Sequence, residues 1–171
     1  ILENPTVGID NSYNLLQEKL PHARLILVGD GVERKKLEKQ IESLKLCGKV
    51  TFTGRINHQE VAKFINISNI VVIPSRYPDP LPTVALEAGY LGRPVIAANR
   101  GGLKEILLDN ETGLLIDGED PQDYASAIYY LFMHPQIAIK MGKAAQLRIK
   151  SVFSWNHYID TYDQLYQRIG A

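Results

Sequence analysis

Short apolar runs alternate with longer amphipathic stretches along most of the chain. Strand-length apolar runs lie at residues 24–28, 49–52, 70–73, 94–97 and 113–116. Apolar residues recur at helical spacing in residues 13–20, 33–46, 58–65 and 83–91, and residues 117–171 are helical in pattern almost throughout. Because near-continuous apolar strands that alternate with helices are typical of buried parallel strands, the pattern predicts one α/β domain. We expect a doubly wound, Rossmann-like parallel sheet with helices on both faces, in which the β-branched run 70–73 is a central strand.

The composition of the chain gives evidence about its binding partners and its location. Lys+Arg and Asp+Glu both number 19, so the formal net charge is zero and no global field favours nucleic acid or an anionic membrane. The single cysteine, Cys47, cannot form an internal disulfide, and no apolar run has the length of a membrane span. We expect a cytoplasmic domain that, in the full-length protein, can lie at the inner face of the membrane.

The loops that follow the strands are where ligands bind in doubly wound sheets. Gly29-Asp30-Gly31 follows an apolar run and precedes a helical one, so backbone there can approach a phosphate. Arg34 occupies the third glycine position of the dinucleotide fingerprint, so on this segment alone a plain turn is favoured over a phosphate site. Gly101-Gly102 follows the run 94–97 and has the same two explanations.

The loop at residues 75–83 carries more chemistry. Pro82 suits the first turn of a helix, so the N–H groups of Thr83 and Val84 would point outward as a diphosphate site. Glu87 lies one turn further on the same face, where a carboxylate can accept hydrogen bonds from both hydroxyls of a ribose. Asp79, on the loop itself, can reach a sugar hydroxyl. The spacing alone equally allows Glu87 to make only an ion pair and Asp79 to shape only a turn.

Five ordered segments together resemble the signature of the group 1 glycosyltransferases (family 4, GT-B fold). That signature reads strand–Pro-Ser, E-x7-E-A, G-x-P-V-I-A, G-G-x-x-E-I and T-G-L-L. The matching segments are residues 70–75, 79–88, 92–97, 101–106 and 112–115, and the resemblance extends over about residues 23 to 168.

The resemblance implies that residues 1–171 are the C-terminal donor domain of a retaining hexosyltransferase. In this family that domain binds a nucleotide diphosphate sugar and needs neither a cofactor nor a metal. Carried over by position, Glu87 would hold the ribose, Arg55 would lie beside the base, and Asp79 would be the catalytic-site carboxylate that bonds the donor sugar. The other implied donor-binding residues are Thr83, Val84, Leu81, Gly29, Gly31 and Gly102.

Two departures from the family pattern concern the site directly. Asp79 stands where the family has a glutamate, so its side chain is one methylene shorter. The family also opens with a strand ending in Gly-Arg, followed by Lys-Gly, whose two cations clamp the diphosphate. Residues 5–8 would be that strand, but residues 9–13 follow without Arg or Lys. Either the protein lacks the clamp, or a stretch between Gly8 and Asn11 is missing from the sequence, which we favour because the downstream motifs are intact.

The implied function is transfer of a sugar from its nucleotide to an acceptor sugar or lipid-linked glycan, in surface glycan or glycolipid assembly. The N-terminal acceptor domain is absent from this chain, so we expect these residues alone to be inactive. A non-catalytic nucleotide-binding module and a GT-B-like sugar-nucleotide epimerase are the alternatives. A dinucleotide-dependent oxidoreductase is disfavoured by the missing fingerprint. The sequence leaves the donor base, the sugar and the oligomeric state open.

Overall fold

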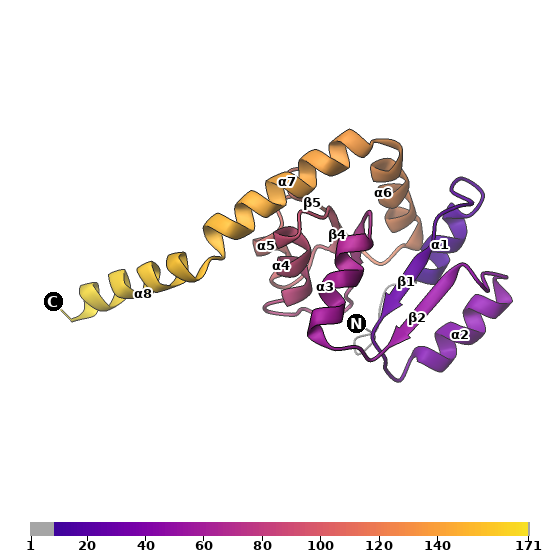
Figure 1. Cartoon of the computed structure of the whole chain (residues 1–171), viewed down its shortest axis with the longest axis horizontal. Coiled ribbons are helices and arrows are strands. Elements are labelled where there is room, and N and C mark those ends of the chain that lie inside the picture. The colour runs from indigo at the N-terminus through magenta and orange to yellow at the C-terminus, as the bar shows by residue number, and fades with distance from the viewer. Residues whose placement is uncertain (1–8, 171) are drawn as a thin grey trace.

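The computed structural model describes residues 9–170, and it confirms the alternation of strands and helices (Figure 1). The strands are β1 (Leu25–Val28), β2 (Val50–Gly54), β3 (Val71–Ile73), β4 (Val95–Ala98) and β5 (Gly113–Ile116). The helices are α1 (Ile9–Leu16), α2 (Arg34–Ser43), α3 (His58–Ile67), α4 (Thr83–Tyr90), α5 (Leu103–Ile106), α6 (Pro121–Met133), α7 (Pro135–Val152) and α8 (Trp155–Ile169). The α/β class with parallel strands is therefore confirmed.

The strands form two sheets rather than the single sheet that we predicted. β1 pairs with β2, and β3, β4 and β5 pair in that order, so no strand among residues 9–170 joins β1 to β3. Among residues 9–170, β3 pairs only with β4, so the described part of the chain does not show the central place that we predicted for residues 70–73. Its β-branched composition instead reflects cover on both faces: Val71 and Ile73 pack in one apolar cluster and Val72 in others.

A cavity of about 560 Å³ lies between the two sheets. It is lined by β1 and β3 on its sides, by Leu16 and Leu20 near α1, and by Phe64 and Ile65 of α3. At one end it reaches the loop that leads into α4. The family's first strand, which we placed at residues 5–8, lies outside the described residues.

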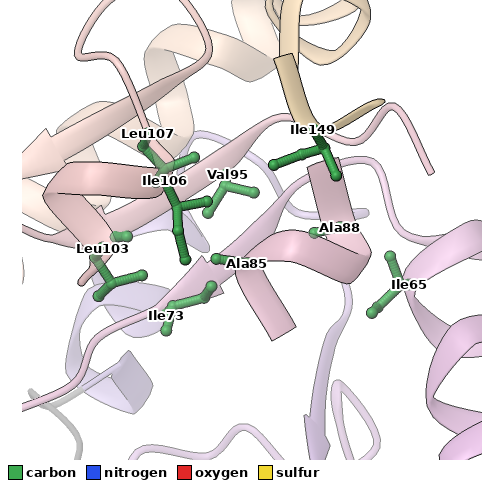
Figure 2. Close-up of a cluster of buried hydrophobic side chains, with 10 residues drawn as sticks. Ile65, Ile73, Ala85, Ala88, Val95, Leu103, Ile106, Leu107 and Ile149 are labelled. Carbon is green, nitrogen blue, oxygen red and sulfur yellow. The ribbon is translucent and has the colours of Figure 1, made fainter. Parts of the chain in front are cut away.

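Small side chains hold α4 tightly in the main apolar cluster. Ala85 and Ala88 are fully buried, and Figure 2 shows them between Val95 of β4, Ile65 of α3 and Ile149 of α7. On the next turn, a Cβ built at Gly89 would lie 2.7 Å from Ile149 Cγ1, so only glycine fits the present spacing of α4 and α7. This packing fixes the direction of α4 and hence the position of its N-terminus.

The helices near the two ends of the chain, α1 and α8, differ in how much the rest of the domain buries them. α1 begins and ends four residues earlier than the predicted helix at 13–20. Leu20 is still buried beside Leu16, from the turn that follows the helix. α8 projects away from the body of the domain, and its residues are exposed throughout (Figure 1). None of the described helices is long and apolar enough to cross a membrane.

Candidate functional site

The predicted site residues gather at the carboxyl ends of the strands, in two groups. The first group follows the β1–β2 sheet. Gly29 has a φ of 117°, which glycine adopts freely, and its N–H donates to Gly54 O at 3.2 Å. Gly31 N–H donates to Asp30 Oδ1 at 2.9 Å, and Arg55 leaves β2 as an exposed residue. Two strand-to-helix turns therefore meet at one end of this sheet.

A charged cluster supports these two turns. Arg34 donates to Glu38 Oε1 at 2.8 Å and to Asp30 Oδ2 at 3.1 Å, and its guanidinium lies over the ring of Phe52. The hydrogen bond with Glu38, followed by the attraction of Asp30, raises the pKa of Arg34 against the opposing effect of desolvation. The residue that breaks the dinucleotide fingerprint is thus a support for the glycine turn, holding the side chain of Asp30 in place.

The second group is built on the N-terminus of α4. Pro82 caps the helix with extended backbone, φ −70° and ψ 91°, and lacks an N–H of its own. Thr83 and Val84 follow as the first two helical residues, whose N–H groups have no preceding turn to accept their hydrogen bonds. α4 therefore begins at Thr83, with Pro82 at its N-cap rather than in the first helical turn.

Asp79 and Leu81 form a tight turn just before this helix. Asp79 Oδ1 accepts a hydrogen bond from Leu81 N–H at 2.9 Å, so the carboxylate does shape the turn. The carbonyl oxygen of Asp79 accepts from Gly102 N–H at 2.8 Å. A Cβ at Gly102 would lie 2.2 Å from Pro80 O, which explains the glycine at this position. The β4–α5 turn therefore packs against the Asp79 loop and is hydrogen-bonded to it.

Glu87 lies one helical turn inside α4, with 22% of its side chain exposed. Its Oε1 lies 3.8 Å from Nδ1 of His58, which is 81% exposed at the first residue of α3. No motif in the sequence links His58 to Glu87. The capping box of Asn57 and Glu60 fixes where α3 begins, but only the packing of α3 against α4 brings the imidazole to this carboxylate.

An arginine–glutamate network closes the far side of the loop, and sequence reasoning missed it entirely. Arg100 Nη1 donates to the carbonyl oxygen of Arg76 at 2.6 Å and to Glu119 Oε1 at 3.0 Å. Glu119 Oε2 also lies 3.3 Å from Arg76 Nε. The three residues follow β3, β4 and β5, so parallel strand order brings them to one edge from far apart in the sequence.

The cavity between the sheets joins only part of the predicted set. Asp79, Leu81, Thr83 and Val84 line its end. The remaining predicted residues do not line it; they are Glu87, Arg55, Gly29, Gly31 and Gly102. Residues 9–170 contain no group of three His, Cys, Asp or Glu side chains that could hold a metal ion.

Comparison with known proteins gives the fold and the site a family. A family profile described as glycosyl transferases group 1 matches residues 4–148. A D-inositol 3-phosphate glycosyltransferase of Paenarthrobacter aurescens is 35% identical over 158 residues, which cover 90% of this chain and 38% of the relative.

Two solved structures share the fold over nearly the whole chain. The sucrose-phosphate synthase of Thermosynechococcus elongatus has 33% identity and a TM-score of 0.81, covering 96% of this chain and 42% of its own. Anabaena HepE in complex with UDP-glucose has 26% identity and a TM-score of 0.82, covering 98% and 46%. The chain thus spans less than half the length of these relatives. It belongs to the group 1 glycosyl transferases and has the fold of their C-terminal GT-B domain.

Proposed function

We propose that this domain binds the nucleotide diphosphate sugar of a retaining glycosyltransferase, with UDP as the nucleotide. The observation that carries the proposal is the common placement of Thr83, Val84 and Asp79 at one end of a single cavity. A helix N-terminus favours a diphosphate through its aligned amides and dipole. A carboxylate beside it can accept hydrogen bonds from a sugar, which gives one site for both halves of the donor.

The ribose is assigned to Glu87. This carboxylate is partly buried and belongs to the same helix as the two amides. Its Oε1 lies 3.8 Å from Nδ1 of His58, too far for a hydrogen bond. Vicinal hydroxyls are donors that a carboxylate can accept in a bidentate manner. Gly29 and Gly31, at the end of β1, would then allow the backbone to approach the donor from the other side.

UDP is favoured over other nucleotides because HepE, which has a TM-score of 0.82 with this chain, was solved with UDP-glucose. In the full-length protein the sugar would pass to a glycan or lipid-linked acceptor held by a second domain. The lengths of the three relatives support a second domain, since all three extend well beyond the part matched here. Transfer itself would therefore be a property of the two domains together.

The test is thermal stabilisation of the domain by UDP, GDP and ADP, with NAD as a negative control. A nucleotide at about a hundred times its Kd adds roughly 2.7 kcal/mol of stability, which in a domain of this size raises Tm by several degrees. We expect UDP to stabilise the wild type and to lose most of that effect in Glu87→Gln. The control is Glu42→Gln, on the exposed face of α2. Stabilisation by none of the nucleotides, or equal stabilisation of Glu87→Gln, would refute the assignment.

A further inference from the structure

We propose that Arg100 is a positioning residue that holds the Asp79 loop in place for the donor sugar. The proposal rests on the proposed function, because it concerns the sugar half of that same site. It assigns a role to a side chain that touches neither the cavity nor the α4 N-terminus. The role would be to fix a backbone segment on which the sugar-binding carboxylate stands.

The loop between β3 and α4 has little regular secondary structure of its own, apart from a single bridge residue at Ser75. Residues 74–82 contain no helix or regular strand, and their shape is therefore set by individual hydrogen bonds. Arg100 Nη1 donates to Arg76 O at 2.6 Å near the start of the loop, and Gly102 N–H donates to Asp79 O at 2.8 Å three residues later. Both donors come from the turn between β4 and α5, so this turn grips the loop at two points.

Glu119, in the loop that follows β5, forms ion pairs with both arginines. Its two carboxylate oxygens lie 3.0 Å from Arg100 Nη1 and 3.3 Å from Arg76 Nε. An ion pair on an exposed surface typically contributes little to stability, because water screens it and the side chains lose freedom. The bond to the carbonyl oxygen of Arg76 is of another kind, since it fixes the main chain of the loop. Arg100, with 32% of its side chain exposed, thus connects the loops that follow β3, β4 and β5.

The nucleotide half of the site is supported differently. Ala85 and Ala88 anchor α4 in the main apolar cluster, so Thr83, Val84 and Glu87 are held by core packing. Asp79 lies outside that packing. Loss of the Arg100 bond should therefore displace the sugar contact while leaving the ribose and diphosphate contacts in place. The two halves of the donor can be read separately by comparing UDP with UDP-glucose.

The experiment measures the Kd of UDP and of UDP-glucose for the wild type, Arg100→Ala and Arg100→Lys by titration calorimetry. The matched control is Arg93→Ala, since Arg93 also donates to a main-chain carbonyl, that of Asn66, but at the opposite end of β4. We expect Arg100→Ala to reduce the affinity gained from the glucose moiety about tenfold, as for a lost hydrogen bond to a charged group, with the Kd of UDP unchanged. Arg100→Lys, which keeps one donor, should recover part of the loss, and Arg93→Ala should leave the ratio of the two Kd values unchanged.

Amide hydrogen exchange gives a second readout that needs no ligand. In Arg100→Ala the amides of Leu81 and Gly102 should exchange faster, whereas in Arg93→Ala they should exchange as in the wild type. Equal weakening of UDP and UDP-glucose in Arg100→Ala, or unchanged exchange at both amides, would overturn the positioning role. If the wild type binds neither ligand, the proposed function fails, and the exchange rates still decide whether Arg100 holds the loop.

Discussion

Replacement of Gly102 by alanine tests whether the Asp79 loop is held as closely as the structure shows. The N-terminal boundary of α5 falls at this residue, and its φ of −71° and ψ of −9° are ordinary helical values that alanine also adopts. The substitution therefore introduces no backbone strain. Its only structural effect is steric: the new Cβ would lie 2.2 Å from Pro80 O and 2.9 Å from Pro80 C.

The size of the effect follows from that overlap. Ordinary contacts of a Cβ begin at 3.4 Å, so the loop must move by about 1.2 Å, and the 2.8 Å bond from Gly102 N–H to Asp79 O lies within the displaced segment. Overpacking of this kind costs about 1–3 kcal/mol, and a lost hydrogen bond costs about 1 kcal/mol more. Replacing glycine lowers the entropy of the unfolded chain and offsets about 0.4–1 kcal/mol. We expect a net loss of roughly 2 kcal/mol.

Urea denaturation followed by circular dichroism measures this loss, with Gly48→Ala as the comparison. Gly48 has a φ of 78°, and no atom lies within 4 Å of the place that a Cβ would take, so its variant experiences conformational strain without a clash. Only Gly102→Ala should also weaken binding of UDP-glucose relative to UDP. A Gly102→Ala protein as stable as the wild type, with its sugar affinity intact, would show that the loop does not rest against this turn.

Two further substitutions test the packing that carries the site. Tyr124→Phe should stabilise the domain by about 1 kcal/mol at neutral pH, because the buried Tyr124 hydroxyl has no hydrogen-bond partner among the described residues. Burial also raises the pKa of Tyr124 to about 12, above its value of 10.0 in the unfolded chain. The stability of the wild type should therefore fall as the pH rises from 10 towards 12. Urea titrations at pH 7 and pH 11 should show a smaller fall in the variant. Gly89→Ala should cost about 1–3 kcal/mol through its clash with Ile149, and the double variant with Ile149→Ala should cost less than the sum of the two single changes, as a denaturation cycle would show.

Sequence periodicity predicted where the elements lie, but not how the strands pair. The helix predicted at residues 58–65 is present, and the helical pattern of residues 117–171 includes α8. Their spacing and their caps, Asn57 and Ser154, are local features. Strand neighbours are decided by contacts far apart in the sequence. A β-branched run such as residues 70–73 indicates that both faces of the strand are covered, but it does not say which strands lie beside it.

The candidate site divides along the same line. Thr83 and Glu87 were predictable because one helical turn separates them, and the structure keeps them on one helix with Pro82 at its cap. The ordered motifs then placed Asp79 and Gly102 in the same site. Arg100 and Glu119 carried no such signal, since each is an ordinary charged residue in a turn and 19 positions separate them. Only the parallel order of β3, β4 and β5 makes them neighbours.

The division of the domain into two sheets suggests how a bound donor would change the stability of the domain. The glycine turns belong to the β1–β2 sheet, whereas the helix amides and Asp79 belong to the β3–β4–β5 sheet. His58, on the helix α3 that packs against α4, approaches Glu87 only to 3.8 Å, which is beyond hydrogen-bond length. A ligand that contacts Gly29 or Gly31 on one side and Thr83 on the other would add bonds between the two sheets. Its binding energy would therefore stabilise the arrangement of the two sheets as well as the loops. For that reason the nucleotide should slow hydrogen exchange in β1 and β3 together, beyond the residues that it touches.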